Sequence, residues 1–533
     1  MKPLRRHYSH LILLTASFFL LSSCSSALAS TTTSTDPQPT SGYVLVTPNP
    51  QITATPFQPS APTDPPPTET ALPTSEPPTS TPQPVESPTE PPAVPTAPSN
   101  PPATSDRPQY FLTALLDYEG HTLNVSEIVT YPNRSAGPLS NIVLAVNPNL
   151  WNGVFTLQSV SVNDQAYSNY SLAGQWFTLN LDKPLESGQA IKIGLGYLLT
   201  LPYSSAKFEN FGYTARQTNL TDWYPFVVPY INGQWVLPDP YPYGENLVYD
   251  KADIQVRLSF ANPASAPVVA ASAPSRLEDG ALVYDLPNAR NFTISASPDF
   301  LMSSADANGV TIYNYYFASN ANAAAMVLEL TRMAVNTYTT EFGPYPHSAL
   351  SVAETDLNDG LETDGLYFLA SSFYSGFDGS VRNNLSTIAV HETAHQWWYG
   401  AVANNQAVEP WLDEAMATYS EHIFYEDNYP DLLNWWWNFR IYSHGATGWV
   451  DSRVYDTSSF RGYVSAVYFN GAQFIQSLRD RIGEKVFFDF IRDYFARNNG
   501  RIATSGDFFA VLDLHTSVDI SDLLQTYFYY RSQ

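Results

Sequence analysis

The sequence predicts an α+β protein in which a large antiparallel β-sheet or sandwich precedes a mainly helical domain. Two patterns along the 533-residue chain carry this prediction. Between Tyr110 and about Phe300, short alternating apolar segments are separated by turn signals, which is typical of antiparallel strands. From about Asn320 onward, apolar residues recur at helical spacing instead. The change of period divides the folded part near residue 305, into residues 108–305 and residues 306–533.

The individual elements follow from this pattern. Strands are expected over residues 122–131, 142–146, 191–195 and 254–258, with an extended segment over residues 349–354 that adds a small sheet to the second domain. Helices are expected over residues 323–338, 386–399, 412–425, 472–481 and 486–495. The first of these helices is expected to stop at Gly343 and Pro344.

The first residues resemble an export signal. A short basic stretch precedes an apolar run over residues 11–21, which is about half of the roughly 20 residues needed to span a bilayer. The run leads to Leu-Ser-Ser-Cys24, which resembles the lipobox of bacterial lipoproteins and contains the only cysteine of the chain. We expect residues 1–23 to be a lipoprotein signal peptide and lipidated Cys24 to anchor the chain on the extracytoplasmic face of the cell membrane. An ordinary signal peptide with an incidental cysteine is the alternative.

Residues 24–107 are rich in proline, threonine and serine. Such a segment cannot bury enough apolar area to offset its chain entropy, so we expect a disordered linker. It would reach about 50 Å as a flexible coil and at most about 250 Å as polyproline II.

Composition excludes several classes of function. The chain carries 25 basic and 50 acidic residues, a net charge of −25, which argues against a nucleic-acid partner. A single cysteine excludes an intramolecular disulfide and a thiolate zinc cluster.

The sharpest motif is the stretch from His391 to His395, which reads His-Glu-Thr-Ala-His. Positions four apart share a helix face, so both imidazoles can bind one metal ion. Glu392 projects toward the water on that metal rather than binding the metal itself. Two structural histidines on an amphipathic helix are the alternative.

A third ligand follows in Glu414, which is separated from His395 by eighteen intervening residues. Pro410 marks the start of a new helix, and packing of this helix on the first would bring Glu414 to the histidines. Two histidines and one glutamate suit zinc, with one ion per chain.

These residues resemble the membrane alanyl aminopeptidase (aminopeptidase N) family of zinc metallopeptidases. The shared features are the two histidines, the 18-residue gap to Glu414 and the Gln396-Trp397-Trp398 that follows His395. The resemblance implies a saddle-like β domain followed by a thermolysin-like domain with a small β-sheet. Longer members continue into a helical C-terminal domain, which we expect this chain to lack because it ends 65 residues after Tyr468.

The segment from Gly360 to Leu366 resembles the exopeptidase motif of the same family. Its glutamate, Glu362 here, would bind the free α-amine of the substrate, as a fixed carboxylate can. Leu361 replaces the usual methionine, and Thr363-Asp364 replaces the usual following residues. An ordinary acidic loop is the alternative.

The segment from Tyr463 to Ala472 resembles the tyrosine segment of the family. The resemblance implies that the Tyr468 hydroxyl donates to the oxyanion and that Tyr463 is the second tyrosine, which helps to bind substrate. Asn470 stands where lysine is usual.

The resemblance thus implies a lipid-anchored zinc aminopeptidase with peptide substrates, in which Glu392 is the general base. A zinc endopeptidase or a dipeptide-releasing peptidase with an open cleft is one alternative. A non-catalytic peptide-binding module of the cell surface is the alternative from another class. The sequence makes no prediction about oligomeric state.

Overall fold

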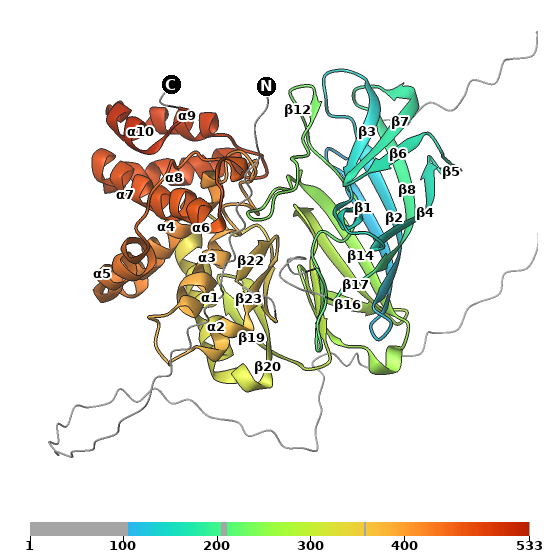
Figure 1. The fold of residues 1–533 in the computed structure, drawn as a ribbon, viewed down its shortest axis with the longest axis horizontal. Coiled ribbons are helices and arrows are strands. Elements are labelled where there is room, and N and C mark those ends of the chain that lie inside the picture. The colour runs from blue at the N-terminus through green and yellow to red at the C-terminus, as the bar shows by residue number, and fades with distance from the viewer. Residues whose placement is uncertain (1–104, 204–210, 357–358, 532–533) are drawn as a thin grey trace, which may run out of the picture. The chain divides into compact units, whose positions relative to one another are not determined.

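The computed structural model describes residues 105–203, 211–356 and 359–531 (Figure 1). All of them belong to one compact unit that starts at Val94. The predicted signal peptide, Cys24 and nearly all of the predicted linker lie outside the described residues. Among the described helices, none combines the length and the apolar character that crossing a membrane requires.

The first part of the described chain is a β domain. Its main sheet has eight strands in the order β16-β17-β14-β1-β2-β8-β4-β5. Their bounds are β1 Gln109–Asp117, β2 Thr122–Pro132, β4 Phe155–Val162, β5 Gln165–Ala166, β8 Ala190–Thr200, β14 Ala252–Phe260, β16 Ser275–Glu278 and β17 Ala281–Ala289. Buried and exposed residues alternate along β1 and β2, so one face of this sheet packs on the core as the period-2 pattern predicts.

One strand pair in this sheet differs from the expected antiparallel arrangement. β1 pairs with β14 in parallel, whereas every other pair in the sheet is antiparallel. The two strands are far apart in the sequence, so no hairpin fixes their relative direction.

Smaller sheets complete the β domain, with the orders β15-β18-β10-β9, β11-β3-β7-β6 and β12-β13. Their bounds are β3 Leu139–Ala145, β6 Tyr170–Ala173, β7 Trp176–Leu185, β9 Gly212–Tyr213, β10 Thr218–Leu220, β11 Phe226–Val227, β12 Tyr230–Ile231, β13 Gln234–Trp235, β15 Val268–Ala271 and β18 Ile294–Ser297.

A five-stranded sheet opens the second part, in the order β19-β20-β21-β23-β22. Its strands are β19 Phe300–Ala307, β20 Val310–Phe317, β21 Ala349–Thr355, β22 Gly360–Thr363 and β23 Leu366–Ala370. The boundary predicted near residue 305 therefore falls inside β19. The hairpin of β19 and β20 still has the period of strands, so the change of period comes after the new sheet has begun.

Helices form the rest of the second part. They are α1 Ala321–Glu341, α2 Ser371–Ser375, α3 Asn384–Ala394, α4 Trp411–Asn428, α5 Leu433–Trp436, α6 Phe460–Val464, α7 Asn470–Ile482, α8 Glu484–Asn498, α9 Ser505–His515 and α10 Ser521–Tyr527. The sheet-rich part followed by a helical part confirms the predicted α+β class. The helix predicted over residues 386–399 is five residues too long at its end, because α3 stops at Ala394.

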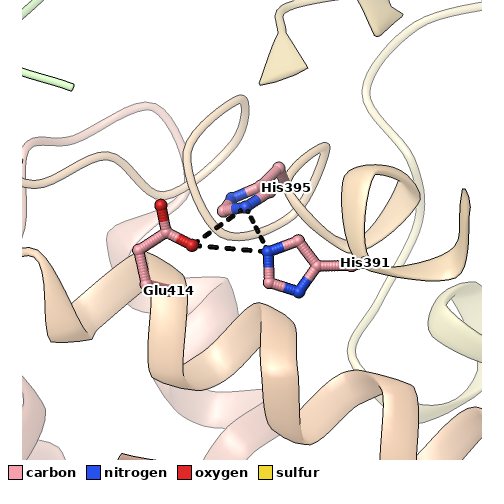
Figure 2. Close-up of side chains that lie close together, drawn as sticks. All are labelled: His391, His395 and Glu414. Atoms are coloured by element: carbon pink, nitrogen blue, oxygen red, sulfur yellow. Dashed lines mark hydrogen bonds and ion pairs between the residues drawn. The ribbon is translucent and has the colours of Figure 1, made fainter. Parts of the chain in front are cut away.

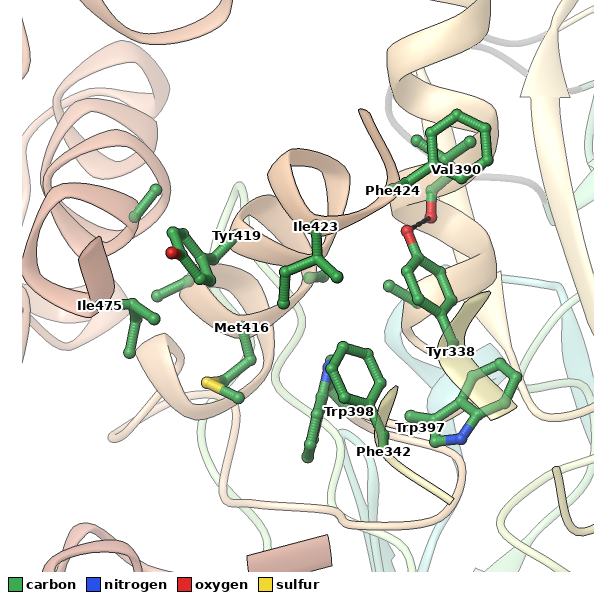
Figure 3. Close-up of a cluster of buried hydrophobic side chains, with 14 of the residues drawn as sticks. Tyr338, Phe342, Val390, Trp397, Trp398, Met416, Tyr419, Ile423, Phe424 and Ile475 are labelled. Atoms are coloured by element: carbon green, nitrogen blue, oxygen red, sulfur yellow. Dashed lines mark hydrogen bonds between the residues drawn. The ribbon is translucent and has the colours of Figure 1, made fainter. Parts of the chain in front are cut away.

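The core of the helical part fixes the two helices that carry the motif residues. Figure 3 shows Tyr338 of α1 among buried aromatic and aliphatic side chains of α3, α4 and α7. The Tyr338 hydroxyl donates to the backbone oxygen of Val390 at 3.0 Å and of Ser420 at 3.2 Å. These two carbonyls precede His391 and Glu421, so one buried tyrosine ties α3 to α4 beside the motif residues.

Candidate active site

His391, His395 and Glu414 converge as the sequence predicts (Figure 2). The two Nε2 atoms lie 3.1 Å apart. Glu414 Oε2 lies 3.3 Å from Nε2 of His391 and 3.4 Å from Nε2 of His395. All three side chains are buried.

Local sequence explains this placement. Asn383 caps α3 by accepting from the backbone N–H of Ser386, which starts the helix about two turns before His391. His395 follows the last helical residue but keeps right-handed helical dihedrals, so it stays one turn above His391. Glu414 lies in the first turn of α4, where the helix dipole favours a carboxylate.

The three residues fit a zinc ion. Zinc bound tetrahedrally at about 2.0–2.1 Å keeps its ligand atoms about 3.3 Å apart, close to the separations found here. Burial alone would lower the pKa of His391, but Glu414 and Glu421 raise it to about 9. Burial would raise the pKa of Glu414, and the two imidazoles lower it below its usual range. The raised pKa of His391 reflects the carboxylates around it, and these carboxylates also favour a bound cation.

A further carboxylate orients His391. Glu421 Oε1 lies 2.9 Å from His391 Nδ1, which leaves Nε2 to face the other ligands. Three hydrogen bonds from Arg440, at 2.9–3.1 Å, and one from Trp436 at 3.1 Å hold Glu421 in place. Glu421 was not among the site residues predicted from the sequence. Its position seven residues after Glu414, two turns along the same helix face, is the signal that would have found it.

Glu392 lies between the two histidines in the sequence and faces the same site. Ligand atoms of Glu392, Glu362 and His395 lie within 4.8 Å of one another. Glu392 Oε2 is buried and has no hydrogen-bond partner among the described residues. A Cβ on Gly360 would meet the carboxylate of Glu392 and the side chain of Ile388, so glycine at this position leaves room for the carboxylate beside β22.

Glu362 occupies β22, the edge strand of the five-stranded sheet. Its Oε1 accepts from the side-chain amide of Gln406 at 3.1 Å. A second carboxylate, Glu245, comes from the β domain, and ligand atoms of Glu245, Glu362 and Glu414 lie within 4.8 Å of one another. Burial raises the pKa of Glu245 well above its usual value, and the charges of Glu362 and Glu414 raise it further. Glu245 was not predicted from the sequence, because no motif lies near it.

The loop that carries Glu245 is fastened to the helical part. The hydroxyls of Tyr241 and Tyr243 both donate to the backbone oxygen of Thr457, at 2.9 and 2.6 Å. Gly244, at φ +72°, lies so close to Tyr463 that a Cβ there would be 3.2 Å from its ring. These contacts hold a residue of the β domain beside the metal ligands.

Asp364 fixes the chain two residues after Glu362. Its fully buried carboxylate accepts from Lys251 Nζ at 3.0 Å and from the backbone N–H of Arg290 at 2.7 Å. His347 Nε2 lies 2.7 Å from its other oxygen. Burial would raise the pKa of Asp364, but Lys251 and His347 lower it below its usual range. The departure from the family motif at this position is therefore a buried ionic anchor between the two parts of the chain.

Tyr468 and Tyr463 both reach the site. Tyr468 lies on a π-helical turn, Ser465–Phe469, and its ring is nearly parallel to that of His391 at a centroid distance of 5.8 Å. Tyr463 packs edge-on against Tyr468, also at 5.8 Å, and is fully buried. Burial raises the pKa of Tyr468 well above its usual value and Glu414 adds to the shift, so the phenol keeps its proton.

A cavity of about 460 Å³ opens beside Glu362 and Glu245. Residues of both parts line it, among them Trp151, Asp222, Tyr249 and Tyr399. The sequence analysis did not identify these lining residues.

The comparisons with known proteins agree with this geometry. The model of the Peptidase family M1 domain matches residues 325–527. Aminopeptidase M1-D of Oryza sativa subsp. japonica is 25% identical over 240 residues, which cover 42% of this chain and 27% of that protein. The chain thus spans about a quarter of the length of this curated relative.

Solved structures match a larger share of the chain. An M1 zinc metallopeptidase from Deinococcus radiodurans is 20% identical with a TM-score of 0.59, and the match covers 79% of this chain and 92% of that one. A second structure is a mutant M1 zinc metallopeptidase from the same organism, bound to a Tyr-Ser-Ala substrate. It is 19% identical with a TM-score of 0.56, and the match covers 79% of this chain and 93% of that one. These matches share the two-part fold described above. Residues 325–527 thus match the model of the Peptidase family M1 domain, which confirms the resemblance seen in the motifs.

Proposed function

We propose that this chain is a zinc aminopeptidase, which removes N-terminal residues from peptides. The observation that carries the proposal is the position of Glu362 and Glu245, whose carboxylates lie within 4.8 Å of the ligand oxygen of Glu414. No cationic side chain pairs with either glutamate within 4 Å among the described residues. The free α-amine of a peptide supplies the missing positive charge and would bring the first peptide bond to the metal site.

Each remaining residue of the site has a role in this reaction. Zinc held by His391, His395 and Glu414 would supply Lewis-acid activation of water and of the peptide carbonyl. Glu392 accepts the proton of the attacking water and passes it to the leaving amine. The Tyr468 hydroxyl donates to the oxygen on which negative charge develops.

The sheet edge suits a peptide substrate. Among the described strands, β22 pairs only with β23, so the other edge of β22 is open beside the site. An extended peptide can pair with such an edge. The Deinococcus radiodurans mutant bound to Tyr-Ser-Ala is a structural neighbour with a peptide ligand and supports this class of substrate.

A pair of matched peptides tests the proposal. The purified full chain, loaded with zinc, is incubated with one peptide whose N-terminus is free and one whose N-terminus is acetylated. The products are identified by mass spectrometry. We expect stepwise loss of single residues from the free peptide only. Internal cuts in both peptides would identify an endopeptidase, and steps of two residues a dipeptide-releasing enzyme. Zinc retention without any cleavage would favour the peptide-binding module.

Glu362→Gln is the variant that tests the amine anchor. We expect kcat/KM on the free peptide to fall roughly tenfold to a hundredfold, because a charge-assisted hydrogen bond is lost, while zinc content stays unchanged. Asp356→Asn is the control, since Asp356 belongs to the same acidic segment but pairs with Arg216. Equal effects of the two substitutions would return Glu362 to the acidic-loop interpretation.

We also propose that the chain is a lipoprotein on the extracytoplasmic face of the membrane, anchored through Cys24. The basic and apolar start of the chain and the position of its only cysteine support this location. Bacteria that express the full chain and are fed radiolabelled palmitate should incorporate label into the wild type and not into Cys24→Ser. An unlabelled wild-type chain would contradict the anchor.

A further inference from the structure

The cavity beside Glu362 contains a third carboxylate that the proposed reaction does not use. We infer that Asp222 selects peptides whose N-terminal residue has a cationic side chain, arginine in particular. The inference rests on the proposed function, since it places the α-amine at Glu362 and Glu245. The first side chain then extends into the rest of the same cavity.

The charged side chains that line the cavity are all acidic among the described residues. The charged residues among its described lining are Asp222, Glu245 and Glu362, and none of the lining residues is lysine, arginine or histidine. Glu245 and Glu362 lie beside Glu414, where the proposed function places the α-amine of the substrate. Asp222 remains as a negative charge that forms no ion pair with any of the described residues.

Asp222 accepts a hydrogen bond but forms no ion pair with any of the described residues. The Tyr249 hydroxyl donates to its Oδ1, and no cationic side chain of the described residues lies within 4 Å. Burial raises the pKa of Asp222 to about 6, so the group is mainly a carboxylate at neutral pH. Asp222 is half-buried in the cavity wall, where a carboxylate is partly withdrawn from water, and a substrate cation can provide the pairing that it lacks among the described residues.

The walls of the cavity favour a flat cation. Trp151, Tyr249 and Tyr399 line it, and aromatic faces attract a guanidinium group. Burial raises the pKa of the Tyr399 phenol well above its usual value, and the charges of Asp222 and Glu362 raise it further. Tyr399 thus lines the same cavity as both carboxylates and is influenced by the charge of each.

Tyr399, in this wall of the cavity, has an unusual backbone conformation. Its φ is +138°, a value that residues other than glycine rarely adopt. Asn291, also in the lining, donates to the Tyr399 hydroxyl at 2.8 Å and holds the ring in place. The cavity volume of about 460 Å³ leaves space for a long side chain.

Arginine and citrulline substrates test the charge directly, because their side chains match in size and differ in charge. The full chain, loaded with zinc, is assayed on aminoacyl-coumarin amides of arginine, citrulline, alanine and glutamate. We expect kcat/KM for arginine to exceed that for citrulline at least about tenfold, as a buried charge-assisted contact requires. Glutamate should be the poorest of the four.

Asp222→Asn should reduce the arginine-to-citrulline ratio to near 1 and leave the alanine rate within about twofold of wild type. Asparagine tolerates the φ of +48° at this position, so the backbone can stay as it is. Asp285→Asn removes an exposed carboxylate of the β domain and is the control for net charge.

The outcomes separate the two proposals. Equal rates on arginine and citrulline, together with hydrolysis of alanine, would overturn the selection by Asp222 and leave the aminopeptidase intact. The same conclusion follows if Asp222→Asn keeps the wild-type ratio. No hydrolysis of any substrate would overturn both proposals.

Discussion

Glu392→Gln is expected to lower kcat for peptide hydrolysis by about 10²- to 10⁴-fold while the zinc content of the protein stays unchanged. Glutamine keeps the size of the side chain but does not accept the proton of the attacking water. The structure supports this separation of chemistry from metal binding. The ligand triad is complete without Glu392, and Glu392 Oε2 has no hydrogen-bond partner among the described residues that would occupy it.

The measurement is a steady-state rate on the free-amine peptide together with the zinc content of the same preparation. Ser386→Ala on the same helix is the matched control, because its buried hydroxyl has no hydrogen-bond partner among the described residues. A zinc-loaded Glu392→Gln chain that cleaves at the wild-type rate would exclude Glu392 as the base.

The convergence of His391, His395 and Glu414 was predictable from the sequence because helical spacing constrains the two histidines. Two histidines four residues apart on one helix must share a face, and the structure places their Nε2 atoms 3.1 Å apart. Glu414 was also predictable, because Pro410 marked the start of its helix and the 18-residue gap matched a known pattern. Local rules were sufficient for these three residues.

Glu245 and Asp222 could not be predicted in this way. Both belong to irregular segments of the β domain, more than a hundred residues before the histidines. Their place at the cavity depends on tertiary contacts, such as the hydrogen bonds from Tyr241 and Tyr243 to Thr457. Neither spacing nor residue type in the sequence encodes such contacts locally.

The fold shows the same limit. Periodicity predicted α1, α4, α7 and α8 in nearly the right place. Periodicity placed the end of α3 too late, because Trp397 and Trp398 continue the apolar pattern after the helix has ended. The backbone N–H of Gly400 bonds to the oxygen of His395 at 2.8 Å, so the chain closes a turn there instead of extending the helix. This turn brings Tyr399 into the cavity.

Tyr468→Phe gives the second large expected effect, a loss of about 10²- to 10³-fold in kcat, typical of removing one oxyanion donor. The substitution removes only the hydroxyl. The ring can keep its parallel packing on His391 at 5.8 Å and its edge contact with Tyr463, so the ligands should hold zinc as before. The raised pKa of the phenol means that the donor is protonated throughout the neutral range.

Tyr374→Phe is the matched control, because Tyr374 is also buried and its hydroxyl has no hydrogen-bond partner among the described residues. Rates and zinc contents of both variants are compared with wild type on the free-amine peptide. A fall in kcat for Tyr468→Phe alone, at full zinc content, would show that the hydroxyl stabilises the transition state. Equal turnover in all three proteins would remove Tyr468 from the chemistry and leave it as part of the wall over His391. The π-helical turn Ser465–Phe469 would then need another explanation, since such turns commonly mark functional sites.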